Sequence, residues 1–137
     1  MDETPRLEDF THVTEDKLRF ADMDRQGHIN NVAFMVFLEQ ARCEVIYDPS
    51  DPIAPEGCAF VVAHIRIDFI DEMLWPGTVH TATRIQSIGR SSIKIEQALF
   101  QNGKPCARAF SVVVLVDDAT RRSTPLPQQA LDRLKAL

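Results

Sequence analysis

The sequence predicts an α+β fold in which an antiparallel sheet of about five strands wraps around one long central helix. Two features carry this prediction. Residues 31–47 form a long helical run whose first two turns are wholly apolar, and four segments after it have the alternating or apolar patterns of strands joined mostly by short turns. Short turns produce antiparallel neighbours, and a single apolar helix needs such a sheet as the second layer of its core.

The first strand is expected at residues 13–21 and the helix at residues 31–47. Asn30 is the expected N-cap, because an asparagine side chain accepts a hydrogen bond from the free N–H groups at a helix start. The first two turns of the helix are apolar on every face, which predicts that the helix is enclosed. The segment DPSDP, residues 48–52, ends it.

The remaining strands follow in order along the chain. Residues 64–69 alternate polar and apolar side chains, as a half-buried strand does. Residues 78–88 are a weaker candidate, and residues 91–100 repeat the alternation up to the hairpin turn QNGK at 101–104. Residues 106–117 are apolar on both faces, which predicts an interior strand.

The two ends of the chain are expected to be peripheral, with a short helix near 128–137. The sequence holds no internal repeat or linker, so residues 1–137 are expected to form a single domain. One sheet cannot cover an apolar helix on all sides. The uncovered face therefore predicts a second copy of the chain, in a homodimer or homotetramer.

Composition narrows the class of function. The formal net charge of −5 is unlike the basic surface of a nucleic-acid-binding protein. Cys43, Cys58 and Cys106 form no CxxC pair, so we expect reduced thiols and neither a disulfide scaffold nor a zinc site. The N-terminus lacks the apolar region of a secretory signal and no stretch has the length of a membrane span. We therefore expect a soluble cytoplasmic protein without metal or nucleotide cofactors.

The segment RFADMDRQGHINNVAFMVFLEQAR, residues 19–42, resembles the DxDxxGHxNNxxYxxxxExxR signature of hotdog-fold thioesterases of the 4-hydroxybenzoyl-CoA thioesterase type. Residues 57–73 and 88–100 look like further parts of that family, so the resemblance covers most of the chain. It implies a hotdog fold and hydrolysis of an acyl-CoA or acyl-carrier-protein thioester. The chain departs from the signature at Phe34, where the family commonly has tyrosine.

The resemblance implies that Asp24 is the catalytic carboxylate, as a general base or as the nucleophile. The alternative is a loop aspartate that caps a turn. His28 is expected to hydrogen-bond the thioester oxygen or to position Asp24, and otherwise to pack in the loop. Asp22 is expected to orient the loop, and Gly27 to let the backbone approach the thioester or adopt a positive φ.

The start of the helix is expected to form the oxyanion hole, because its first N–H groups are unpaired and its dipole favours negative charge. By motif position the donor is the backbone N–H of Asn31, which Asn30 helps to orient as the cap. Glu39 and Arg42 lie three apart inside the helix. They predict a buried ion pair with a structural role.

The turn GRSS, residues 89–92, is expected to bind the phosphates of coenzyme A through Arg90, Ser91 and Ser92, because guanidinium and hydroxyl groups suit phosphate oxygens. The alternative is a plain hairpin turn. Lys94 lies near this turn in the sequence and is expected to contribute, and Arg66, Arg84 and Lys104 are further candidates for the phosphate site.

Two other functions use the same fold and stay open at this point. One is a dehydratase or hydratase acting on enoyl thioesters, which the early position of the DxDxxGHxNN motif argues against. The other is a non-catalytic protein that binds acyl thioesters, which the presence of Asp24, Gly27 and His28 together argues against.

Overall fold

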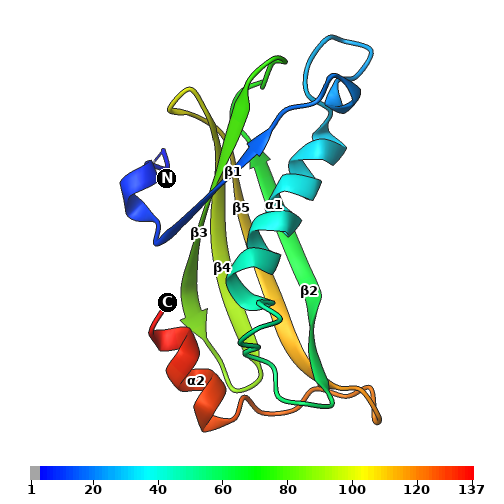
Figure 1. Ribbon diagram of the computed structural model, residues 1–137, viewed down its shortest axis with the longest axis vertical. Coiled ribbons are helices and arrows are strands. Elements are labelled where there is room, and N and C mark those ends of the chain that lie inside the picture. The colour runs from blue at the N-terminus through cyan, green and yellow to red at the C-terminus, as the bar shows by residue number, and fades with distance from the viewer. Residues whose placement is uncertain (1–3) are drawn as a thin grey trace.

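A computed structural model describes residues 4–137. Its five strands are β1 (His12–Lys17), β2 (Cys58–Phe69), β3 (Thr78–Ile88), β4 (Ser92–Gln101) and β5 (Lys104–Asp117). They form one sheet in the order β1-β3-β4-β5-β2, and every neighbouring pair is antiparallel. The long helix packs against one face of this sheet (Figure 1). The predicted α+β architecture is confirmed.

The central helix α1 (Asn31–Ile46) begins where the sequence predicts, since the Asn30 side chain accepts a hydrogen bond from the Val32 N–H. Only one side of the helix is buried against the sheet. On the other side Val32 is 63% exposed and Val36 52% exposed, with Met35 beside them. The sheet of one chain therefore does not enclose the helix, and its enclosure by a second copy stays a prediction. The uncovered face that we expected is present. It is apolar in the first turns of the helix, and Glu39, Gln40 and Glu44 are exposed further along.

The strand bounds differ from the predicted ones by more than two residues in β1 and β2. β1 ends at Lys17, and a 3-10 helix, η2 (Phe20–Asp22), takes the residues beyond it. β2 begins at Cys58, six residues before the predicted start. A register shift between Val62 and His64 interrupts the two-residue period there, so the alternation becomes readable only after the bulge.

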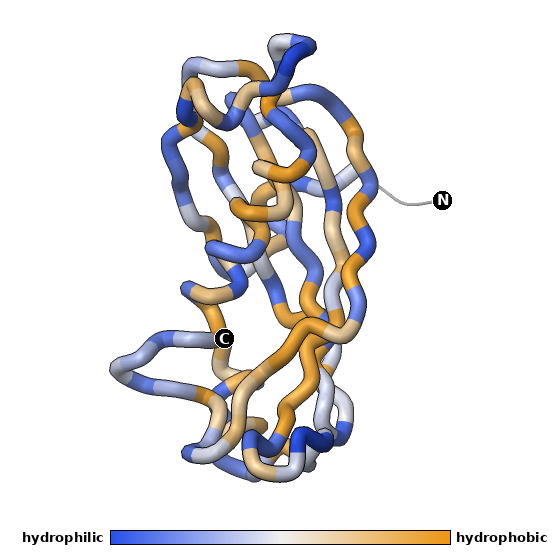
Figure 2. Tube along the Cα trace, turned by 90° about the vertical axis from the view of Figure 1, so that its right-hand side faces the viewer, coloured by the Kyte–Doolittle hydropathy of each residue, from blue (hydrophilic) through white to orange (hydrophobic). Residues whose placement is uncertain are grey.

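The hairpin between β4 and β5 forms at the predicted turn. Asn102 and Gly103 take φ values of 53° and 77°, the left-handed conformations that a two-residue hairpin turn requires. β5 lies between β4 and β2, which confirms the interior position predicted from its apolar character. Figure 2 shows the long hydrophobic stretches of the trace in the strands and the hydrophilic tips at the turns.

The ends of the chain contribute more to the core than the sequence predicts. Helix α2 (Gln128–Lys135) buries Ala130 and Leu134 in the cluster that surrounds the second half of α1. Near the other end, Leu7 and Phe10 pack on a buried cluster formed by Ala82, Ala98 and Phe100. Among the described residues, no helix combines the length and the apolar character that crossing a membrane requires.

Arg42 takes a partner other than the predicted one. Its side chain is buried and donates from Nη1 to Oε1 of Gln97 on β4, at 3.3 Å. Gln97 in turn donates to the carbonyl oxygen of Leu38, at 3.0 Å, so this polar group fastens α1 to the middle of the sheet. Glu39 is exposed, and no ion pair joins it to Arg42 within residues 4–137. Burial lowers the pKa of the Arg42 guanidinium.

Asp22 fixes the chain between β1 and α1. Its carboxylate accepts hydrogen bonds from the backbone N–H of Arg19 at 2.9 Å and from Nη2 of Arg19 at 2.7 Å. Its own carbonyl oxygen accepts from the Asn30 N–H at 2.7 Å. The hydrogen bonds from Arg19 hold the pKa of the Asp22 carboxyl below its ordinary value. These contacts support the predicted structural role of Asp22.

Asp22→Ala is expected to lower the free energy of unfolding at pH 7 by about 1–3 kcal/mol, the size of a hydrogen bond to a charged group. A lowered carboxyl pKa stabilises the fold above the ordinary aspartate pKa of about 3.9, and this contribution is lost as the pH falls through the lower folded value. The stability difference between the two proteins should therefore shrink below about pH 4. Urea unfolding at several pH values measures it.

Asp9→Ala is the matched control, because Asp9 holds the same position relative to Arg6 in an exposed 3-10 helix. We expect Asp9→Ala to lower the free energy of unfolding clearly less than Asp22→Ala does. An equal loss of unfolding free energy in the two variants, or a loss in Asp22→Ala that does not change with pH, would contradict the structural role of Asp22.

Candidate active site

The loop that leads into α1 is closed by its own hydrogen bonds. The Asp24 N–H donates to the carbonyl oxygen of His28 at 2.8 Å, and the Gly27 N–H donates to the carbonyl oxygen of Asp24 at 3.1 Å. Oδ1 of Asp24 accepts from the backbone N–H groups of Gln26, at 2.9 Å, and of His28, at 3.4 Å. Gly27 has a φ of +82°, which the turn needs and which glycine adopts at little cost.

This loop is bonded to the segment that follows β2. The Ile29 N–H donates to the carbonyl oxygen of Met73 at 2.9 Å, and the side chains of both residues are buried in the same core cluster. Ile29 and Met73 are 44 positions apart in the chain, yet this hydrogen bond places their segments side by side. A pocket can therefore form between them with both walls held by the core.

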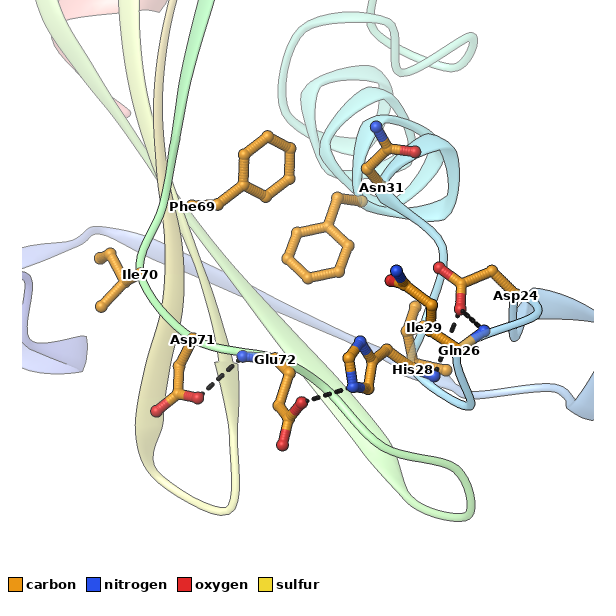
Figure 3. A pocket seen from close by; sticks show the side chains of 10 residues that line it. Asp24, Gln26, His28, Ile29, Asn31, Phe69, Ile70, Asp71 and Glu72 are labelled. Atoms are coloured by element: carbon orange, nitrogen blue, oxygen red, sulfur yellow. Dashed lines mark hydrogen bonds and ion pairs between the residues drawn. The ribbon is translucent and has the colours of Figure 1, made fainter.

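A pocket of about 510 Å³ lies at this place (Figure 3). One wall comes from the loop and the first turn of α1, and the other from the end of β2 and the residues after it. The lining residues are Asp24, Gln26, His28, Ile29, Asn31, Phe34, Phe69, Ile70, Asp71 and Glu72.

The pocket has an apolar part and a charged part. The rings of Phe34 and Phe69 lie 5.3 Å apart between centroids and form the apolar part. On the charged side, Nε2 of His28 lies 2.7 Å from Oε2 of Glu72. Asp71 pairs with Lys104 at 2.8 Å, and this hydrogen bond holds the pKa of the Asp71 carboxyl below its ordinary value.

The amino end of α1 opens on the same pocket through Asn31. Oδ1 of Asn30 accepts a hydrogen bond from the Val32 N–H, and the carbonyl oxygen of Asn30 accepts one from the Ala33 N–H, both at 2.9 Å. The Asn31 N–H has no acceptor among residues 4–137. A free N–H at the positive end of a helix dipole is suited to bind an oxygen that gains negative charge.

The structure brings the three predicted catalytic residues together. Asp24, His28 and Asn31 all line the pocket. Gly27 and Asn30 lie in the same loop but outside the lining, where Gly27 supplies the turn and Asn30 caps the helix. Phe34 takes the predicted position of the family tyrosine as an apolar wall, without a hydroxyl group.

The predicted phosphate-binding turn lies elsewhere in the chain. Arg90 and Ser91 lie in the turn between β3 and β4, and Ser92 begins β4; Figure 1 shows this turn at the end of the sheet away from the amino end of α1. The carbonyl oxygens of Arg90 and Ser91 accept from the N–H groups of Leu126 and Leu115, both at 2.8 Å. Within one chain, this turn and the pocket do not form one site.

The other predicted cations are divided between the sheet and the pocket. Arg66 pairs with Asp68 at 3.1 Å on β2, and Arg84 pairs with Glu96 on the sheet. Lys104 lies at the edge of the pocket, because it pairs with the lining residue Asp71. No cluster of three or more His, Cys, Asp or Glu side chains suited to a metal ion occurs in the described part of the chain.

Sequence reasoning missed the second wall of the pocket. Phe69, Asp71 and Glu72 follow a strand whose alternation was recognised, but nothing in their own pattern shows which loop they face. The available signal was the acidic pair directly after an apolar strand end. Its meaning depends on the Ile29–Met73 contact, which the sequence does not display.

Comparisons with known proteins agree with this fold. A family model described as the thioesterase-like superfamily matches residues 18–134. The long-chain acyl-CoA thioesterase FadM of Escherichia coli (strain K12) is 24% identical over 128 residues, which are 90% of this chain and 97% of that protein.

Two solved structures are similar along nearly the whole chain. A thioesterase from Thermus thermophilus in complex with coenzyme A and Zn has a TM-score of 0.81 and 29% identity, covering 92% of this chain and 98% of that one. A predicted thioesterase from Bacillus stearothermophilus has a TM-score of 0.83 and 28% identity, covering 90% and 93%. With a hotdog fold and a family match that spans most of its length, the chain belongs to the thioesterase-like superfamily.

Proposed function

We propose that this thioester hydrolase acts on acyl-CoA through Asp24, His28 and the amino end of α1. The observation that carries the proposal is the pocket in which a carboxylate, an imidazole and a free helix N–H meet. Hydrolysis of a thioester needs an activated water or a nucleophile, a donor for the carbonyl oxygen and a thiolate that leaves. The pocket supplies the first two from residues only seven positions apart.

Each group has a defined part in the reaction. Oδ1 of Asp24 is held by the loop, and Oδ2 has no hydrogen-bond partner within residues 4–137, so it can accept a proton from water or attack the carbonyl carbon. The Asn31 N–H and the His28 ring bind the carbonyl oxygen as it becomes an oxyanion. The tetrahedral intermediate collapses, the C–S bond breaks, and the sulfur leaves as the thiolate of coenzyme A. Attack by water gives the free acid directly, whereas attack by Asp24 gives an anhydride that water then hydrolyses to the free acid and the original carboxylate.

The substrate is inferred from the pocket and the relatives. The rings of Phe34 and Phe69 provide an apolar surface for an acyl group next to the polar groups. The E. coli relative is named for long-chain acyl-CoA, and the T. thermophilus relative holds coenzyme A. The resemblance of residues 19–42 to the DxDxxGHxNN signature supports membership of the 4-hydroxybenzoyl-CoA thioesterase type. Coenzyme A enters as part of the substrate, and no further cofactor is proposed.

We also propose that the protein works as an isologous dimer in the cytoplasm. The uncovered side of α1 presents Val32, Met35 and Val36, and the adjoining edge strand β2 presents Val61 and Val62 about half exposed. An apolar helix face beside an unpaired strand edge is unfavourable in water and suits a second copy. The three free cysteines accord with a reducing compartment.

A dimer of this kind would unite the two separated parts of the substrate site. Ser92 is opposite Val114 in the sheet, and Val114 is opposite Val61, so the turn at 89–92 lies near the start of β2. The pocket lies at the end of β2, at Phe69. If two β2 strands pair antiparallel across a two-fold axis, the start of one strand lies beside the end of the other. Arg90 of one protomer then approaches the pocket of its partner.

Asp24→Asn is expected to reduce kcat at least about 100-fold, because the amide can neither accept the proton nor attack the carbonyl. The amide oxygen can still accept the bonds from Gln26 and His28, so the loop should remain folded. Thiol release from acyl-CoA esters of several chain lengths, with circular dichroism for folding, measures the effect. Asp48→Asn is the matched control, since Asp48 caps a similar turn away from the pocket. Turnover near the wild-type rate in a folded Asp24→Asn protein would refute the assignment.

Arg90→Ala is expected to raise KM for an acyl-CoA about tenfold and to leave KM for the matching acyl-pantetheine nearly unchanged, because only coenzyme A carries the nucleotide phosphates. A mixed dimer of one Arg90→Ala chain and one Asp24→Asn chain tests the arrangement across protomers. It should contain one intact site with a wild-type KM. A mixed dimer whose KM stays raised would place Arg90 and Asp24 of the same chain in one site. Equal effects on both substrates would remove the phosphate role.

A further inference from the structure

We propose that Glu72 is a positioning residue for catalysis, which acts by holding the imidazole ring of His28. Oε2 of Glu72 lies 2.7 Å from Nε2 of His28 across the pocket, a distance typical of a charge-assisted hydrogen bond. Figure 3 shows this contact bridging the two walls, with the other ring nitrogen turned away from Glu72. The inference rests on the role of His28 in the proposed function.

The backbones on both sides of this contact are fixed. The Ile29 N–H, one residue after His28, is bonded to the carbonyl oxygen of Met73, one residue after Glu72. The carbonyl oxygen of Cys106 on β5 accepts from the N–H groups of Ile70 and Asp71, at 2.9 and 3.1 Å. The Glu72 carboxylate is therefore presented to His28 by the same frame that forms the pocket.

The contact between His28 and Glu72 is too exposed to contribute much to the stability of the fold. The side chains of His28 and Glu72 are 41% and 48% exposed, and ion pairs at such positions contribute little to folding. Neither side chain has a competing hydrogen-bond partner within residues 4–137, since the His28 backbone N–H, and not its ring, bonds to Asp24. What the contact determines is the orientation of the ring and the nitrogen that carries the proton.

The chemical consequence follows from the two nitrogens of imidazole. A carboxylate that accepts from Nε2–H keeps the proton on that nitrogen and leaves Nδ1 to face the substrate. In the form with a proton on both ring nitrogens, Nε2–H donates to Glu72 and Nδ1–H donates to the thioester oxygen. Glu72 touches neither the substrate nor the reacting atoms in this scheme, so its effect must pass through His28.

A double-mutant cycle on the whole protein tests this dependence. We expect Glu72→Ala to lower kcat about tenfold with little change in KM, a loss somewhat below that of removing a proton-transfer group. In a His28→Ala background the same substitution should change kcat less than about twofold, because the group through which it acts is gone. Glu72→Gln keeps an oxygen that can accept from Nε2–H, and it should recover part of the lost activity.

Nitrogen NMR on protein labelled at histidine gives a readout that a purely structural role would not change. The wild-type His28 ring should show Nε2 protonated in its neutral form, and Glu72→Ala should shift it towards a mixture of both tautomers. Glu15→Ala is the matched control, because Glu15 belongs to a second carboxylate–histidine pair outside the pocket, with its Oε2 3.8 Å from Nε2 of His80. It should leave the His28 signals unchanged.

The outcomes separate this inference from the proposed function. A wild-type kcat in Glu72→Ala, or a tenfold loss that persists in the His28→Ala background, overturns the positioning role of Glu72. An unchanged His28 tautomer in Glu72→Ala overturns it as well. A wild-type kcat in His28→Ala overturns instead the role of His28 in the proposed function.

Discussion

The bond from the Ile29 N–H to the carbonyl oxygen of Met73 is the contact on which the site depends. It joins the loop before α1 to the segment after β2, and both side chains are buried in the core. A displacement of either segment would separate the two walls of the pocket and expose apolar surface in the same movement. The hydrophobic core therefore sets the spacing between Asp24 and His28 on one wall and Glu72 on the other.

The loop satisfies its own polar groups in a way that leaves the reactive ones free. One oxygen of Asp24 accepts the hydrogen bonds that close the turn, and Asn30 accepts hydrogen bonds from the N–H groups of Val32 and Ala33. The Asn31 N–H and the second Asp24 oxygen are left without a hydrogen-bond partner among the described residues. The sequence presents two alternative roles for Asp24, a cap of the turn and the catalytic carboxylate. One side chain can fill both roles, because each uses a different oxygen.

Features that depend on local pattern were predictable, and those that depend on distant pairing were not. The α1 boundary followed from Asn30 and the apolar run, and the interior position of β5 followed from its apolar faces. The start of β2 was missed because a bulge breaks its period, and Arg42 was given the wrong partner because Gln97 lies on another strand. The loop half of the site was readable as a motif. The other half required the antiparallel register of the sheet and a contact between segments far apart in sequence.

The most direct test of the account is a crystal structure with a non-hydrolysable acyl-CoA in which a methylene group replaces the thioester sulfur. The account predicts that the ketone oxygen lies about 3 Å from the backbone nitrogen of Asn31, with the Asp24 carboxylate facing the carbonyl carbon. The nucleotide phosphates should lie at the 89–92 turn of a second protomer. A ketone carbonyl bound away from the amino end of α1 would contradict the account.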